Sequence, residues 1–122
     1  MITAHTGAVL VVTGALTIGA GVAALVPRWA LRCVFGVDHI DPLTILVARH
    51  WALLLTLIGG LLVYAAYHPE VRVPVMIAAT IEKLAVGALI FASPFRKKPL
   101  AALVAIADPI MALLYLAIFA GL

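Results

Sequence analysis

The chain has 122 residues, of which 66% are hydrophobic and only 11% are charged, and its mean hydropathy of +1.27 lies far above that of soluble domains. This composition excludes a soluble globular domain, and the length leaves room for one domain of about four membrane spans at roughly 20 residues each. The formal charge of +3 is concentrated in two short stretches, so anionic lipid head groups explain it better than nucleic acid.

The first apolar run covers residues 6–26 and stops at Pro27. No Lys or Arg precedes this run, which is also longer than the apolar part of a secretory signal, so we expect a permanent helix. Glycines recur in it at Gly7, Gly14 and Gly21. The seven-residue spacing keeps small residues on one face and predicts a closely packed neighbouring helix.

The next segment, PRWALRCVFGVDHIDP, interleaves large apolar side chains with Arg28 and Arg32. This pattern is typical of a short helix that lies in the plane of the lipid head groups. Cys33 is the only cysteine of the chain, so we expect neither an internal disulfide nor a cysteine metal site.

Three more apolar runs follow, at residues 43–67, 71–93 and 100–121, and prolines mark their ends. Each run is long enough to cross a membrane, and each should be a helix because backbone groups in lipid must be paired within the segment. The whole chain, residues 1–122, is therefore predicted to form a single all-α domain, an integral membrane four-helix bundle. The short interfacial helix would lie between the first and second spans.

Basic residues predict the orientation of the bundle. The first and third loops together carry five Lys or Arg residues, whereas Arg72 is the only one in the N-terminus, the second loop and the C-terminus. Because Lys and Arg favour the cytoplasmic side, both termini should lie on the non-cytoplasmic side. We expect a multi-pass protein of a bacterial cytoplasmic (inner) membrane, with membrane lipids as its surroundings.

Each predicted span carries polar side chains where hydrocarbon would be expected. They are Thr17 in the first span, Arg49 and His50 in the second, Glu82 and Lys83 in the third, and Asp108 in the fourth. At a rise of ~1.5 Å per residue, counted from the cytoplasmic end of each span, these groups fall within a band of roughly 6 Å. The sequence therefore predicts a polar layer near the middle of the bundle.

A lone charge at this depth costs about 2.5–3.5 kcal/mol, so the four charges need partners. Two cations, Arg49 and Lys83, balance two carboxylates, Glu82 and Asp108. Adjacent helical residues point about 100° apart, so Glu82 and Lys83 cannot face the same partner. We expect pairs between helices, such as Arg49 with Glu82 or Asp108, which leaves Lys83 to the other acid or to the interface. The sequence does not choose between these pairings.

The layer has two interpretations, a salt-bridge network that sets helix register and a functional site. Buried ion pairs add little stability compared with apolar packing, whereas ionisable groups inside a membrane usually mark a site. Pro109, directly after Asp108, removes one backbone hydrogen bond and opens the helix there. His50 can titrate near neutral pH and could relay protons, and Trp51 beside it packs against lipid or a neighbouring helix.

Several stretches carry a resemblance to known proteins: FGVD and DP, then RHWALLL with Gly59 and Gly60, EK in the third span and D in the fourth. In span number and spacing, over most of the chain, this pattern resembles small four-span bacterial membrane proteins of the broad DoxX-like group. The resemblance implies a quinone or another lipid-like ligand. A weaker similarity, to four-span sterol-binding and sterol-isomerising proteins, rests on the residue types of Glu82, Asp108 and Trp51.

The leading hypothesis is a membrane-embedded binding protein, dimeric or larger, for a lipid-soluble ligand such as a quinone or an isoprenoid. Its site would comprise Arg49, His50, Glu82, Lys83 and Asp108, with Thr17 and Trp51. The alternatives are a proton-coupled small transporter or channel subunit, with Glu82 or Asp108 as proton carrier, and a structural subunit of a membrane complex.

Catalysis stays open, because an acid–base role for Glu82 or Asp108 depends on geometry. No catalytic residue is assigned from the sequence. His5, His68 and Glu70 should share the non-cytoplasmic face, but their spacing matches no metal motif. A metal site is therefore not predicted there.

Overall fold

The computed structural model of the chain describes residues 2–23, 25–36 and 39–121. Ala24, inside the predicted first span, and Val37 and Asp38, in the FGVD stretch, lie outside the described residues. Every element found in the described part is helical, which confirms the predicted all-α class there. In chain order the elements are the 3-10 turn η1 (Ile2–His5), α1 (Thr6–Ala23), α2 (Pro27–Phe35), α3 (Pro42–Tyr67), η2 (Pro69–Val71), α4 (Arg72–Phe91), η3 (Pro94–Lys97) and α5 (Pro99–Phe119).

Prolines set several of the helix starts. Pro27, Pro42 and Pro99 occupy the first positions of α2, α3 and α5, where a helix has no use for the missing N–H group. The predicted boundaries differ from the helices by one or two residues in three spans. In the first span the prediction is wrong by three residues, because α1 ends at Ala23 rather than at residue 26.

Three helical segments in the described part are long and apolar enough to cross a membrane: Pro42–Tyr67, Pro69–Phe91 and Pro99–Phe119. A fourth crossing is reached if α1 and α2 are counted together, although these two helices are bent by 110° relative to one another. The structure therefore agrees with three or four membrane-crossing helices.

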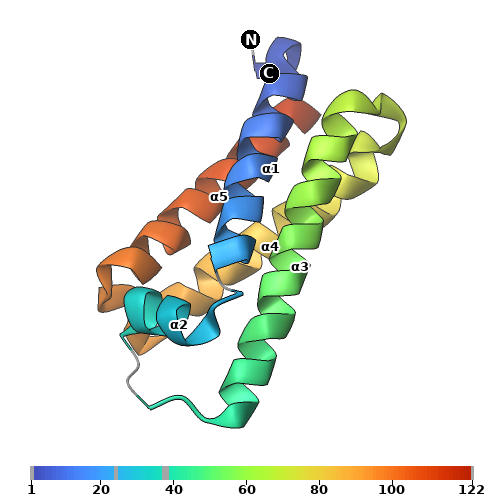
Figure 1. Cartoon of the computed structure of the whole chain (residues 1–122). Helices are drawn as coiled ribbons and strands as arrows, with labels where there is room; N and C mark the ends of the chain where they lie inside the picture. Colours follow the sequence, from blue (N-terminus) through green and yellow to red (C-terminus); the bar gives the residue numbers. More distant parts are fainter. Residues whose placement is uncertain (1, 24, 37–38, 122) are drawn as a thin grey trace.

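Four long helices, α1, α3, α4 and α5, lie side by side, and α2 lies across one end of them (Figure 1). The two ends of the chain lie together at the opposite end. The packing is uneven, because α1 contacts α3 and α4 contacts α5 much more extensively than the two pairs contact each other. This division into two helix pairs leaves room between them.

Glycine makes the close approach of α1 and α3 possible. A Cβ atom added to Gly14 would lie 2.8 Å from the carbonyl oxygen of Gly59, and one added to Gly21 would lie 2.8 Å from the backbone nitrogen of Thr56. Neither position has space for a methyl group. The glycine-lined face predicted from the sequence is therefore the face with which α1 packs on α3, at least over these two positions.

Asp41 stabilises the start of α3 as its N-cap. Its Oδ1 accepts a hydrogen bond of 2.7 Å from the Thr44 backbone N–H, and this hydrogen bond lowers the pKa of the Asp41 carboxyl below its ordinary value. A carboxyl with a lowered pKa contributes stability above its unfolded-state pKa and loses it as the pH falls through the lowered value.

We expect Asp41→Ala to lower the thermal midpoint at pH 7, and Asp41→Asn to retain most of the wild-type value because its side-chain oxygen still accepts the bond. As the pH falls below about 4 the advantage of the wild type over Asp41→Asn should begin to shrink, and it should be lost only when the pH passes below the lowered pKa of the folded state. Thermal unfolding in nanodiscs across this range measures both effects. Equal midpoints for the wild type and Asp41→Ala at pH 7 would contradict the assignment.

Candidate functional site

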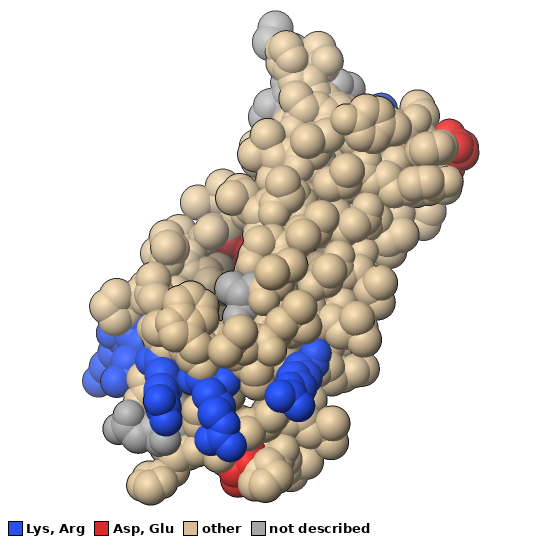
Figure 2. Space-filling model, viewed as in Figure 1, with Lys and Arg blue, Asp and Glu red and all other residues tan. Residues whose placement is uncertain are grey.

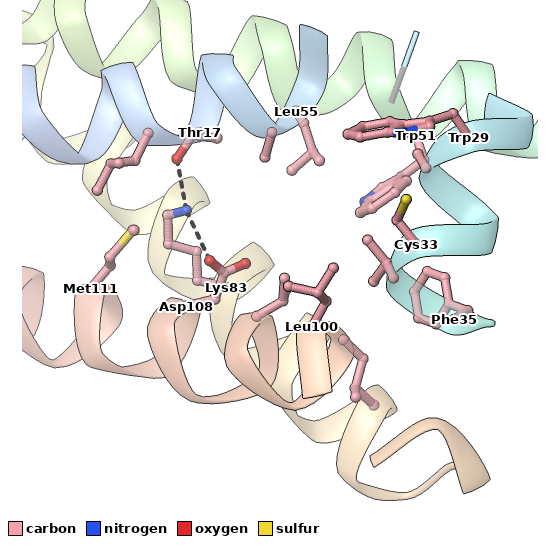
Figure 3. Close-up of a pocket in the computed structure, with 16 residues that line it drawn as sticks. Thr17, Trp29, Cys33, Phe35, Trp51, Leu55, Lys83, Leu100, Asp108 and Met111 are labelled. Carbon is pink, nitrogen blue, oxygen red and sulfur yellow. Dashed lines mark hydrogen bonds and ion pairs between the residues drawn. The ribbon is translucent and has the colours of Figure 1, made fainter. Parts of the chain in front are cut away.

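A cavity of about 290 Å³ lies between the two helix pairs. Its walls are almost entirely apolar and include Leu16 of α1, Leu55 of α3, and Leu100, Val104 and Met111 of α5. Figure 3 shows α2 at one end of this space and the side chains of Lys83 and Asp108 at the other. The cavity therefore has an amphipathic helix at one end and a charged pair at the other.

The position of α2 depends on contacts at both ends of this short helix. Ala30 is buried against Ala52 and Trp51 of α3, and the ring of Phe35 meets Phe95 edge-on at 5.2 Å between centroids. Gly36 ends the helix in the left-handed conformation, with φ of 65°, which suits glycine because it has no Cβ. These contacts place Trp29, Cys33 and Phe35 along the cavity.

Lys83 forms the centre of the polar end. Its side chain is only 1% exposed, and its Nζ donates a hydrogen bond of 2.9 Å to Thr17 Oγ1. The Thr17 hydroxyl donates in turn to the Thr13 carbonyl at 2.8 Å, so its oxygen is free to accept from the lysine. Side chains from α1 and α4 thus meet inside the bundle.

Asp108 supplies the counter-charge from α5. Its Oδ1 lies 3.7 Å from Lys83 Nζ, and its side chain is 15% exposed. This contact is the one ion pair found within residues 2–23, 25–36 and 39–121. Because 3.7 Å exceeds the usual N–H···O range of 2.7–3.2 Å, the two groups attract each other without forming a hydrogen bond.

Glu82 lies beside this pair but does not line the cavity. It is half-buried, and its Oε2 is a buried side-chain oxygen without a hydrogen-bond partner among the described residues. Pro109, the residue after Asp108, contacts α4 closely, since a Cβ on Gly87 would lie 2.6 Å from its ring. Of the predicted layer, Lys83 contacts both Thr17 and Asp108, whereas Glu82 neither pairs with them nor lines the cavity.

The structure places Arg49 and His50 elsewhere. Both are exposed on α3, neither lines the cavity, and Arg49 forms no ion pair with Glu82 or Asp108, the pairing favoured above. The depth count from the start of α3 was misleading, because α3 is 26 residues long and extends past α2 (Figure 1). Trp51, by contrast, does line the cavity.

Exposed basic side chains form a belt around the end that carries α2, and Figure 2 shows them as a blue band at one level. The exposed Lys and Arg residues of this part of the chain are Arg28, Arg32, Arg49, Arg96, Lys97 and Lys98. The opposite end has Arg72, whose guanidinium donates to the carbonyl oxygens of Ala65 and Ala66 at the end of α3. Arg72 therefore caps a helix. In the belt, Arg96 likewise donates to a carbonyl oxygen, that of Ser93 at 3.1 Å, but its side chain is exposed like those of the other belt residues.

Two groups of residues were missed or misplaced by sequence reasoning. Trp29, Cys33 and Phe35 line the cavity, although the pattern of α2 indicated only that one of its faces is apolar. Tyr115 lies near the outer end of the predicted fourth span, where an aromatic side chain is expected to belong to a belt at the membrane surface, and the structure contradicts that expectation. Its side chain is 0% exposed, and its hydroxyl donates to Thr13 Oγ1 at 2.7 Å.

His68 is one of the outer histidines and contacts Tyr64. His68 stacks on Tyr64 with 4.0 Å between ring centroids, and its Nδ1 lies 3.1 Å from the Tyr64 carbonyl oxygen. Across the residues with described positions, no three His, Cys, Asp or Glu side chains come together.

Comparison with protein families, curated proteins and solved structures finds no match for this chain. The chemistry of the cavity therefore has to be argued from its own residues.

Proposed function

We propose that the chain is a membrane-embedded binding protein for a lipid-soluble ligand that carries a polar head group, such as a quinone-like or isoprenoid-like molecule. The observation that supports this proposal is the cavity of about 290 Å³ with apolar walls that ends on Lys83 and Asp108. Ligand pockets commonly have this character, an apolar lining with a few polar groups that orient the ligand.

The pair of Lys83 and Asp108 supports a ligand site, because stability alone does not explain an ion pair at this position. An ion pair inside a bundle is no more stabilising than well-packed apolar residues of similar size. Lys83 and Asp108 both line the cavity, so their polar atoms can contact a ligand as well as each other. A head group at this end and a hydrocarbon chain that runs along Leu55 and Leu100 toward α2 would match the lining at both ends.

The proposal includes a membrane arrangement. In it α1, α3, α4 and α5 each cross the bilayer as a four-span bundle, and α2 lies in the head-group plane because Arg28 and Arg32 are exposed while Ala30 is buried. The basic belt would face the cytoplasm, which puts both termini on the other side. The resemblance to DoxX-like proteins motivates a bacterial cytoplasmic membrane as the location.

Membrane lipids are the proposed surroundings of the outer faces, where large side chains such as Leu46, Leu53 and Leu57 are at least half exposed. A dimer or larger homo-oligomer remains part of the proposal, and cross-linking in native membranes would test it.

Ligand binding explains the polar end better than a proton-coupled transporter or channel does. The Thr13 and Thr17 hydroxyls donate to the carbonyls of Val9 and Thr13, and backbone carbonyls cannot pass a proton onward. Within the described residues the hydroxyl chain next to Lys83 is therefore interrupted. Proton flux into liposomes that is abolished by Asp108→Asn would favour the transporter instead.

A large side chain introduced into the cavity should displace the ligand. Ala20 lines the cavity and Ala15 does not, although both are exposed residues of α1. We expect the wild type and Ala15→Phe to retain a lipid-like molecule through purification, and Ala20→Phe to lose most of it because the ring occupies the cavity. Native mass spectrometry and lipid extraction measure the difference.

The result that contradicts the proposal is equal retention by Ala15→Phe and Ala20→Phe, or no retained molecule in the wild type together with no thermal response to added isoprenoids or quinones. A ligand bound elsewhere, for example on the outer faces, would give the first result.

A further inference from the structure

The hydrogen-bonding capacity of Lys83 is not filled by the protein. An ammonium group carries three N–H donors, and within the described parts of the chain Lys83 Nζ makes one hydrogen bond, to Thr17 Oγ1. Its second neighbour, Asp108 Oδ1, lies beyond hydrogen-bond distance at 3.7 Å. A side chain that is 1% exposed therefore has spare donors next to a cavity that it lines.

The Asp108 carboxylate lacks hydrogen-bond donors, just as Lys83 lacks further acceptors. The ionised carboxylate can only accept hydrogen bonds, and among the residues with described positions no donor lies within hydrogen-bond distance of either oxygen, the Lys83 Nζ being 3.7 Å from Oδ1. Figure 3 shows the Asp108 carboxylate and the Lys83 ammonium facing the same space. The polar end of the cavity thus offers a donor and an acceptor side by side.

We propose, building on the function proposed above, that the ligand's head group is a neutral hydroxyl that bridges Lys83 and Asp108. One oxygen atom can lie about 2.8 Å from both Nζ and Oδ1 when these are 3.7 Å apart. A hydroxyl accepts a hydrogen bond from the lysine and donates one to the carboxylate, so both groups gain a hydrogen-bond partner. The ligand class is a lipid alcohol with an aliphatic or isoprenoid chain.

Other head groups fit less well. A carboxylate or phosphate would bring a negative charge next to Asp108, and an amine would bring a positive charge next to Lys83. A ketone, a quinone carbonyl or an ether can accept from Lys83 but leaves the Asp108 oxygen without a donor, and an unfilled polar group beside a ligand lowers its affinity.

The test uses the full chain in phosphatidylcholine nanodiscs and three probes of similar shape: farnesol, farnesyl methyl ether and the matching hydrocarbon without oxygen. The readouts are the thermal midpoint and the rate at which a membrane-permeable maleimide alkylates Cys33, which lines the cavity and is exposed. Cys33 is the only cysteine, so the alkylation reports one site.

We expect farnesol to raise the midpoint and slow the alkylation at a half-saturating mole fraction about tenfold or more below that of the ether, because the ether cannot donate to a charged acceptor. The hydrocarbon should be weaker still. In the variant with Lys83→Met and Asp108→Leu the preference for the alcohol should vanish, and Lys98→Met should leave it unchanged.

Equal responses to farnesol and its methyl ether would overturn the hydroxyl assignment while leaving ligand binding intact. Equal responses to all three probes would also overturn the hydroxyl assignment, since the cavity would then select only for apolar chains. Absence of any response, together with equal ligand retention by Ala15→Phe and Ala20→Phe, would overturn the proposed function as well.

Discussion

Lys83→Met is expected to lower the free energy of unfolding by about 3–5 kcal/mol, because it leaves the Asp108 carboxylate buried without a counter-charge. The change also removes the hydrogen bond that Thr17 Oγ1 accepts from Nζ. Thr17 itself loses little, since its hydroxyl still donates to the Thr13 carbonyl. Denaturant or thermal unfolding of the purified chain in detergent micelles measures the loss.

The double variant of Lys83→Met with Asp108→Leu separates two explanations of that loss. If the cause is an uncompensated buried charge, removing both partners should restore most of the stability, since apolar replacements of buried ion pairs are often neutral or stabilising. Lys98→Met, a change in the exposed belt, should have little effect and serves as the control. A double variant as unstable as Lys83→Met would show that the lysine acts through packing instead.

The second large effect is expected at Gly59, where α1 and α3 meet. A Cβ atom added there would lie 2.6 Å from Ile18 Cγ1 and 2.7 Å from the Gly14 carbonyl oxygen. Because one of these contacts is backbone, the helices themselves would have to separate. We expect Gly59→Ala to destabilise the chain by about 1–3 kcal/mol, the usual cost of overpacking, measured by the same unfolding experiment.

Gly60 provides a matched control one residue away. A Cβ atom added at Gly60 meets nothing within 4 Å, so Gly60→Ala changes the same helix without touching a neighbour. We expect it to be neutral or slightly stabilising, because alanine favours the helix over glycine by about 1 kcal/mol. A loss of stability at Gly60 equal to that at Gly59 would indicate that helix flexibility, rather than the contact with α1, is what the glycines provide.

These predictions concern the two features that shape the cavity, the polar contact of Lys83 and the glycine contacts within each helix pair. Gly14 and Gly59 bring α1 against α3, and Gly87 brings α4 against α5, where an added Cβ would lie 3.2 Å from the Ala105 carbonyl oxygen. Close packing within each pair leaves the space between the pairs unfilled. Lys83 reaches across that space from α4 to Thr17 of α1, so the polar contact joins the pairs where the backbones stay apart.

Much of the secondary structure could be predicted from the sequence. Apolar runs of about 20 residues in a membrane allow only helices, and prolines such as Pro42 and Pro99 mark where two of them begin. The short helix with Arg28 and Arg32 is present at the chain positions where the alternating pattern predicted a helix. These properties depend on local composition and on the chemistry of the backbone, which a single sequence contains in full.

The sequence also indicated that charges from different helices would have to meet, because each alone would be costly in lipid. Only the tertiary structure decided which ones do. Lys83 faces Asp108, whereas Arg49 is exposed on α3. The choice depends on how far each helix extends beyond its neighbours and on its rotation about its own axis, and neither quantity is contained in the sequence of one helix.

The cavity likewise depends on tertiary structure alone. The apolar face of α2 could equally have been turned toward lipid, and the contacts of Ala30 with Ala52 and of Phe35 with Phe95 decide that it faces the bundle. Composition sets which side chains avoid water, but it does not distinguish lipid from a protein interior, because both are apolar. In a membrane protein the sequence therefore determines the helices, and the packing of glycine-lined and charged faces determines the site between them.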